Sequence, residues 1–592
     1  MAAKKTSRLR SREWFDIPGD PSTTALHIER YTNFGISSEE LRSGKPIIGI
    51  AQTGSDLVPC NRIHINLALR VREGIREAGG IAIEFPVHPI QETGKRPTAA
   101  LDRNLQYLGL VEVLFGYPID GVVLTIGCDK TTPALLMAAS TVDIPSICLS
   151  SGPMMNGYWK GERAGSGTIV WKARKLLATG EIDEEEFIQI VVDATTSPGF
   201  CNTMGTATTM NSLAEGLGMS LPGCAAIPAP LSERLEMSYR TGQRIVEMVK
   251  KDLTPSKILT RKAFENSIVL NSAIGGSTNA PIHINAIARH VGVELEIEDW
   301  EKVGLEIPML VNMQPGGKYL GEDFHRAGGV PAVMNALLKA GKLHDSAITV
   351  NGKTVAENYA ETTTQDTDVI RTFQNPMLEN AGFIVLKGNI FDSAVMKTSV
   401  ISDSFRSQYL DKPGSKNVFE VRAIVFEGPE DYRKRINDSP LKINVDCILV
   451  IRGCGPVGYP GSAEVVNMQP PDKLIREGIL ELPTLGDGRQ SGTSGSPSIL
   501  NASPESAVGG GLALLKTGDM LLIDLNQGSL DVMLDKSELQ KRHDELKTEE
   551  IENQTPWQEI YRNTVGQLSS GGIIELAAKY RKIRNTIPRH SH

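Results

Sequence analysis

Three cysteines share one kind of place along this 592-residue chain. Cys60 stands in DLVPCNRIH, Cys128 in TIGCDKTTP and Cys201 in SPGFCNTMGTATTM, and a helical pattern follows each of them. The N-terminus of a helix stabilises a thiolate, and thiolates are ligands for soft metal ions and iron–sulfur clusters. Three converging thiolates can hold a metal or a cluster and leave one coordination position open.

The spacing of these cysteines leaves a second interpretation open. Tens of residues separate them, and the chain contains neither a CxxC nor a CxH pair, so no zinc-finger interpretation is available. A lone cysteine in a large enzyme is more often a small buried apolar residue. The chain has 7 cysteines, and an odd number without a secretion signal argues against a disulfide framework.

Carboxylates and one lysine form a second group of candidates. Asp129 and Lys130 directly follow Cys128, Glu92 lies in HPIQETGKRP, and Glu464 lies in the Gly- and Pro-rich segment GPVGYPGSAEVVNM. Carboxylates on loops suit a hard cation such as Mg²⁺. Taken singly, each acid is more typical of a solvated surface, and Lys130 of an ion-pair partner.

Two glycine-rich segments complete the candidates. GDGRQSGTSGSPS (486–498) contains Ser491, whose hydroxyl can act as a nucleophile or base on a backbone that allows close approach. The alternative is a flexible surface loop. AIGGSTNAPIH (273–283) can cradle an anion through its backbone N–H groups, although it fits no Walker or dinucleotide fingerprint.

Alternating strands and helices are expected to position these residues. Three short apolar runs are typical of buried strands: 45–52, 81–87 and 121–127. Helical patterns follow at 64–80 and 131–141, the second with a threonine at its cap position and Pro133 in its first turn. Such units over 45–380 predict a parallel α/β sheet with helices on both faces, and ligands gather at the carboxyl ends of its strands.

After about residue 380 the pattern changes to strands joined by turns. The strand-like runs are FIVLKGNI, FEVRAIVFEG, DCILVIRG and MLLIDLNQGSLDVML. The last segment contains TPWQEIYRNTV and GGIIELAAKYRKI, which have helical patterns. The fold class is therefore α/β, with a large N-terminal parallel-sheet domain at 1–380, a smaller β-rich, barrel-like domain at 381–545 and a helical tail at 546–592.

The composition excludes several classes of protein. A formal net charge of −8 argues against a nucleic-acid-binding protein. The basic N-terminus has no apolar core of a signal peptide, and no apolar stretch is long enough for a membrane span. A cytoplasmic enzyme with no nucleic-acid or membrane partner is expected.

Seven short segments run in a recognisable order through nearly the whole chain. They are PCN (59–61), GCDKTTP (127–133), GSGT (165–168), CNTMGTATTM (201–210), GGSTNA (275–280), GPVGYPGSAE (455–464) and DGRQSGT (487–493). In this order they resemble the dihydroxyacid/phosphogluconate dehydratase family. FPVHPIQE, RPTAALDRNLQYLGLVE and PWQEIYR look closest to its sugar-acid branch.

The resemblance implies two metal sites. Cys60, Cys128 and Cys201 would hold a [2Fe–2S] cluster in which one iron lacks a fourth protein ligand. The oxygen ligands of Mg²⁺ would come from Glu92, Asp129, Glu464 and a carbamylated Lys130.

The resemblance also implies roles for three further residues and an assembly. Ser491 would be the catalytic base and Thr493 a substrate contact. His592, at the end of the tail, would help to close the pocket near a neighbouring subunit. The expected assembly is a homodimer or homotetramer.

The reaction implied by the resemblance is the removal of water from a sugar acid to give a 2-keto-3-deoxy acid. D-xylonate is the expected substrate, with D-gluconate second. Thr131–Thr132 and Gln490 depart from the residues typical of the branched-chain amino-acid enzymes of the family, and a polar Gln490 suits a hydroxylated substrate. Dihydroxyacid dehydration stays an alternative, as does a cluster-free hydrolase or a phosphosugar-binding protein.

Overall fold

A four-stranded parallel sheet lies at the centre of the N-terminal part of the chain. The protein is described by a computed structural model that covers residues 9–547 and 551–590. The strand order is β2–β1–β3–β4, and β3 and β4 are buried along their whole length, which explains their continuous apolar sequence. The strands are β1 (Ile47–Gln52), β2 (Ile81–Pro86), β3 (Gly121–Ile126) and β4 (Ser146–Ser150).

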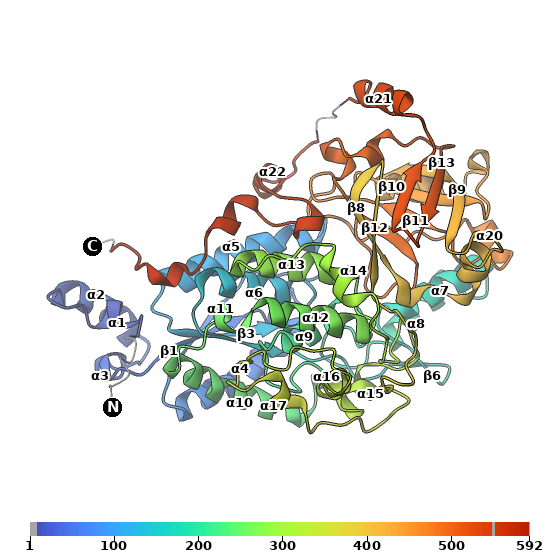
Figure 1. Ribbon diagram of the computed structural model, residues 1–592. Coiled ribbons are helices and arrows are strands. Elements are labelled where there is room, and N and C mark those ends of the chain that lie inside the picture. Colours follow the sequence, from blue (N-terminus) through green and yellow to red (C-terminus); the bar gives the residue numbers. More distant parts are fainter. Residues whose placement is uncertain (1–8, 548–550, 591–592) are drawn as a thin grey trace.

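Helices cover both faces of this sheet, as the sequence predicts. On one face α4 (His64–Glu77) packs against α10 (Ser232–Lys250), and on the other α5 (Ala99–Gly116) packs against α6 (Thr131–Val142), which also contacts α13 (Ala280–Val291) (Figure 1). The largest buried apolar cluster of the described residues lies between these layers. The predicted parallel α/β fold is confirmed.

The predicted alternation of strands and helices ends earlier than residue 380. Among the described residues after Ser150, the α/β part contains helices and one small hairpin. Its two strands, β5 (Tyr158–Trp159) and β6 (Glu162–Arg163), have two residues each. Its further long helices are α7 (Thr168–Thr179), α8 (Glu184–Asp193), α9 (Thr206–Gly216), α12 (Arg261–Ala273) and α16 (Gly329–Lys339).

The predicted N-cap of α6, a threonine, is wrong by one position. The helix begins at Thr131 itself, and the backbone carbonyl of Lys130 accepts from the N–H of Ala134, so Lys130 stands at the cap position. Pro133 lies in the first turn, as expected, where its missing N–H costs nothing. Lys130 therefore leads directly into a fully buried helix.

The C-terminal part contains a closed eight-stranded barrel, which confirms the predicted β-rich fold. Four neighbouring strands, in the order β9–β10–β11–β12, are parallel, so their carboxyl ends lie at one end of the barrel. The sequence patterns do not predict the strands β8, β11 and β12. The strands are β7 (Phe383–Gly388), β8 (Phe391–Lys397), β9 (Val418–Glu427), β10 (Cys447–Arg452), β11 (Thr484–Gly486), β12 (Ser498–Ser503), β13 (Met520–Asp524) and β14 (Ser529–Val532).

The tail returns from the barrel to the α/β part (Figure 1). It carries α22 (Pro556–Arg562), after α21 (Lys536–Asp544) at the end of the barrel part, whereas the second predicted tail helix is only a short 3-10 turn, η8 (Glu575–Lys579). The indole of Trp557 donates to the carbonyl of Leu101 at 3.2 Å. None of the described helices has the length and apolar character needed to cross a membrane. The exact domain limits stay predictions.

Candidate metal and catalytic site

Strand ends from both parts of the protein supply the candidate residues. In the sheet, Cys60 follows β1, Glu92 follows β2 and Cys128 follows β3, at the edge where neighbouring parallel strands end. In the barrel, Glu464 follows β10 and Ser491 follows β11, which are also parallel neighbours. The carboxylate oxygens of Glu92 and Glu464 lie within 4.8 Å of each other, which shows that the sheet edge and the barrel end face each other.

The three predicted cysteine ligands lie in one electrostatic neighbourhood. The sulfurs of Cys60 and Cys128 are close enough to share a hydrogen bond, and Cys201 is close enough for the charge of Cys60 to raise its pKa. Gln91 Nε2 donates to Cys60 Sγ at 3.2 Å, and Ser166 Oγ donates to Cys201 Sγ at 3.4 Å. The structure thus places the three thiols near one another, although their sulfurs do not all lie within 4.8 Å of each other, and their role as cluster ligands stays a prediction.

These thiols need added positive charge to ionise together. The hydrogen bond from Cys128 lowers the pKa of Cys60, and the same bond, followed by burial, raises the pKa of Cys128 well above its usual value. Burial, followed by the charge of Cys60, raises the pKa of Cys201 to about 12. Three thiolates therefore coexist only beside a cationic group, and bound iron has that property. The donor set fits an iron–sulfur group.

Three carboxylates form a compact acidic site beside the thiols. Ligand oxygens of Glu92, Asp129 and Glu464 all lie within 4.8 Å of one another, and no other such set of acidic, histidine or cysteine groups occurs in residues 9–547 and 551–590. Like charges this close repel unless a cation lies among them, and oxygen ligands suit a hard divalent cation. The predicted acids therefore form a site that could hold a metal ion.

Lys130 lies in the middle of this acidic site. Its Nζ is 3.0 Å from Glu92, 3.5 Å from Asp129 and 3.7 Å from Glu464. Lys130 Nζ and Glu92 Oε2 are both buried without an aligned hydrogen-bond partner in the described part of the chain. An ammonium and a divalent cation compete for the same oxygens. The carbamylation implied by the resemblance would turn this competitor into an oxygen ligand.

Arg489 is a second buried cation that joins the two parts of the protein. It is 1% exposed, and it donates to Glu464 Oε1 at 2.8 Å and to Glu92 Oε1 at 3.4 Å. Burial raises the pKa of Glu92, but the charges of Lys130 and Arg489 outweigh burial, so the net pKa lies below its ordinary value. Burial, followed by the charge of Glu92, raises the pKa of Glu464. Arg489 thus holds one acid from each part of the chain.

The loop after β11 is packed against the α/β part, so the flexible-surface interpretation of this segment is wrong. The backbone N–H of Ser491 donates to Asn467 Oδ1 at 3.2 Å, and Ser491 Oγ lies 3.0 Å from Thr493 Oγ1. Gly167 has a φ of +82°, and a side chain there would lie 2.6 Å from Thr493. The GSGT segment therefore needs its glycine to accommodate the loop that carries Ser491.

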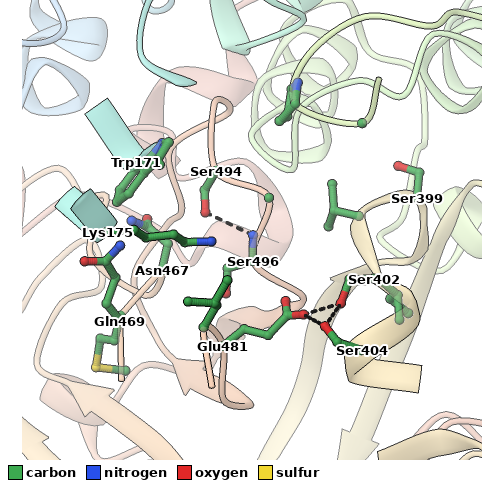
Figure 2. A pocket seen from close by; sticks show the side chains of 17 residues that line it. Trp171, Lys175, Ser399, Ser402, Ser404, Asn467, Gln469, Glu481, Ser494 and Ser496 are labelled. Atoms are coloured by element: carbon green, nitrogen blue, oxygen red, sulfur yellow. Dashed lines mark hydrogen bonds between the residues drawn. The ribbon is translucent and has the colours of Figure 1, made fainter. Parts of the chain in front are cut away.

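Two cavities share Trp171 as a wall beside this loop. One, of about 480 Å³, is shown in Figure 2, with Trp171 and Asn467 on one side and Ser402, Ser404 and Glu481 on the other. The other, of about 640 Å³, is lined in part by Arg163, Gln314 and Thr493. Both volumes lie in the range of small-molecule sites.

Two family models match the chain in succession. The model described as dihydroxy-acid/6-phosphogluconate dehydratase N-terminal matches residues 45–358, and its C-terminal counterpart matches residues 368–572. The chain belongs to the dihydroxy-acid/6-phosphogluconate dehydratase family. It is an enzyme of the hydro-lyase type, so the hydrolase and phosphosugar-binding alternatives are set aside.

Several named dehydratases are similar over most of their length. The chain is 61% identical over 592 residues to a D-xylonate dehydratase of Caulobacter vibrioides, covering 100% of this chain and 99% of that protein. It is 45% identical to an L-arabinonate dehydratase of Rhizobium leguminosarum bv. trifolii, covering 90% of each. It is 37% identical to a dihydroxy-acid dehydratase of Caldanaerobacter subterraneus subsp. tengcongensis, covering 91% of this chain and 95% of that protein.

One interpretation from the sequence needs correction in this dehydratase, and another stays a prediction. Gln490 is 2% exposed and donates to the carbonyl of Ser496 at 3.1 Å, while its Oε1 is buried without a hydrogen-bond partner among the described residues, so its preference for a hydroxylated substrate stays a prediction. In the GGSTNA segment, the backbone N–H groups of Gly276, Ser277 and Asn279 already donate within the protein, which removes the anion cradle. The predicted role of His592 falls outside the described residues.

Three side chains that the sequence did not single out support the site of this dehydratase. Asn279 Nδ2 donates to Glu464 Oε1 at 2.9 Å, and Asn61 Oδ1 accepts from the N–H of Cys128 at 2.7 Å. Arg489 is the third. The only signal for them was their position inside the PCN, GGSTNA and DGRQSGT segments, next to the residues that were singled out.

Replacing Arg489 with methionine is expected to destabilise this dehydratase by about 3–5 kcal/mol, because it leaves buried carboxylates without their partner. The midpoint of thermal unfolding should fall, and added Mg²⁺ should recover part of the loss by binding the folded state. Arg433→Met is the control, since Arg433 lies 3.8 Å from Glu430 in an exposed pair worth little. An unchanged midpoint for R489M would contradict the role of Arg489.

Proposed function

We propose that this enzyme dehydrates a sugar acid, D-xylonate first and D-gluconate second, to the 2-keto-3-deoxy acid. One observation carries the proposal: thiols, carboxylates and the Ser491 loop converge where the sheet edge meets the barrel end. The 61% identity to a D-xylonate dehydratase over the whole chain supports the choice of substrate. The dihydroxy-acid dehydratase among the relatives is more distant, at 37% identity.

The proposal includes two metal groups. Cys60, Cys128 and Cys201 would hold an iron–sulfur cluster, of the [2Fe–2S] type that the family resemblance implies, and its positive charge would let the three thiols ionise together. The oxygen cluster around Lys130 would hold Mg²⁺ once Lys130 is carbamylated. When bound, these groups supply Lewis acidity for the substrate's carboxylate and hydroxyl oxygens.

The chain's own residues would then perform the proton transfer. Deprotonated Ser491 Oγ would take the proton from C2 of the sugar acid, and the electron pair of that C–H bond would form the C2–C3 double bond of the enol as the C3 hydroxyl leaves as hydroxide, which becomes water with one proton. Uptake of a proton at C3 would then convert the enol to the 2-keto-3-deoxy acid. Asn467 fixes the backbone of Ser491, and Thr493 lies against its hydroxyl. A hydroxyl is a weak base, so its environment must stabilise the deprotonated form.

The cavities beside Trp171 suit a short polyhydroxylated chain. Their walls combine amides, hydroxyls and charged groups with one indole ring, as Figure 2 shows for Asn467, Ser494 and Glu481. A site with placed polar groups binds a hydroxylated substrate better than an aliphatic one, because those groups are otherwise left unpaired. We also propose that the enzyme is cytoplasmic and assembles as a homodimer or homotetramer.

An anaerobic activity panel on iron-replete protein with Mg²⁺ tests this function. The substrates are D-xylonate, D-gluconate, L-arabinonate, D-galactonate and 2,3-dihydroxyisovalerate, and the readout is the 2-keto acid product. We expect the highest kcat/KM for D-xylonate. A preference for 2,3-dihydroxyisovalerate, with little turnover of every sugar acid, would overturn the proposal in favour of the branched-chain reaction.

A further inference from the structure

A short hydrogen-bond relay ends on the hydroxyl of Ser491. Trp171, in α7, donates its indole N–H to Thr493 Oγ1 at 3.0 Å. Thr493 Oγ1 lies 3.0 Å from Ser491 Oγ, and the backbone N–H of Thr493 also donates to Ser491 Oγ, at 3.4 Å. Trp171 and Ser491 do not need to touch, because Thr493 connects them.

The chemistry of the indole sets the direction of this relay. An indole N–H can only donate, so Thr493 Oγ1 must accept from Trp171. Either hydroxyl of the Thr493–Ser491 pair could donate to the other, but a deprotonated Ser491 Oγ can only accept. In that form both the hydroxyl and the backbone N–H of Thr493 donate to Ser491 Oγ. Two donors aimed at one oxygen stabilise its deprotonated form.

We propose that Trp171 is a positioning residue that orients the Thr493 hydroxyl toward Ser491 and so prepares Ser491 Oγ to accept the C2 proton. This inference rests on the proposed function, in which Ser491 is the base. It explains how an ordinary serine acts as a base, because Trp171 occupies one acceptor position of the Thr493 hydroxyl and so favours its donation to Ser491 Oγ.

The surroundings of the relay contain charges of both signs. Trp171 and Thr493 line the larger cavity, and Trp171 also lines the smaller one, where Figure 2 shows it. The Lys172 ammonium is bonded to Glu162 at 2.9 Å, which leaves it less able to act on Ser491. The charged groups facing the two cavities, or close to the loop, are Glu162, Arg163, Lys172, Lys175, Lys318, Glu481 and Arg489.

The variant Trp171→Phe tests the relay because it keeps an aromatic wall and removes only the donor. We expect kcat to fall about 10-fold, the size of one lost hydrogen bond to a charged group, with KM within about 2-fold of its original value. With C2-deuterated D-xylonate, the isotope effect on kcat should be at least as large as in the unaltered enzyme. An unchanged kcat, or a loss in which the isotope effect disappears, would overturn the proposal.

Trp300→Phe is the matched control. The indole of Trp300 is buried and donates to Asn285 Oδ1 at 2.9 Å, in a region that lines neither cavity. It loses the same kind of hydrogen bond, so its kcat should stay within about 2-fold of the unaltered enzyme even if its stability falls. An equal loss of kcat in both variants would mean that only packing had been disturbed.

Variants of Thr493 test the relay without altering Trp171. Thr493→Ser keeps the hydroxyl and should keep kcat within about 3-fold, whereas Thr493→Val should lose at least as much as Trp171→Phe. Equal activity of the two Thr493 variants would contradict the relay. Ser491→Ala distinguishes a failure of the relay from a failure of the proposed base. If it stays active, the proposed base is wrong, and if it is inactive while W171F is normal, only the relay is wrong.

Discussion

Replacing Ser491 with alanine is expected to lower kcat by at least about 10³-fold while the iron content stays unchanged. Removing a positioned base typically costs 10²–10⁴-fold in rate. The substitution removes one oxygen whose only side-chain partner in the described residues is Thr493. The loop should keep its place, because Asn467 binds the backbone and not the side chain of Ser491.

The measurement is the initial rate with D-xylonate, taken together with iron analysis and visible absorbance. Ser537→Ala is the control, because Ser537 is exposed in α21 and bonds only to its neighbour Asp535, at 2.6 Å. It should match the unaltered enzyme in both rate and iron. Substantial turnover by S491A would exclude Ser491 as the base, whereas a loss of iron in S491A would show that the loop supports the cluster.

Local sequence patterns were sufficient to predict where the ligands of the sheet lie. Cys60, Glu92 and Cys128 follow strands whose apolar runs are visible in the sequence, and parallel strands end at one edge. The barrel was predictable as a class, because the segments that form β9 and β10 are rich in β-branched and aromatic residues typical of strands. Its strand β11 has only 3 residues in a loop-rich region, which is too short for any periodicity to show.

The contacts that organise the catalytic loop were beyond prediction because they join distant parts of the chain. Trp171 and Thr493 are 322 positions apart, and Arg489 reaches Thr98 across 391 positions. Neither contact has a local signature, since an arginine in a Gly-rich segment and a tryptophan in an amphipathic helix are ordinary on their own. The assignment of Arg489 and Trp171 required the packing of the barrel end against the sheet edge.

Replacing Cys128 with serine is expected to abolish iron binding and activity together. Cys128 is 1% exposed, and its N–H is held by Asn61 at 2.7 Å, so a serine there would keep the backbone but lose the thiolate. A serine hydroxyl ionises far less readily than a thiol, and the loss of one of three ligands leaves iron weakly held. The visible absorbance of the protein should disappear with the iron.

Cys148→Ser is the matched control for this result. Cys148 lies in β4, is fully buried, and its pKa is raised by burial and then by the charge of Cys224, so it belongs to a different neighbourhood. The variant should keep its iron, because Cys148 contributes packing and no ligand, although a buried hydroxyl will cost stability. Equal iron loss in both variants would mean that destabilisation explains the effect, and full iron retention by C128S would remove Cys128 from the ligand set. The contrast thus separates a ligand from a buried apolar cysteine, the two interpretations that spacing alone left open.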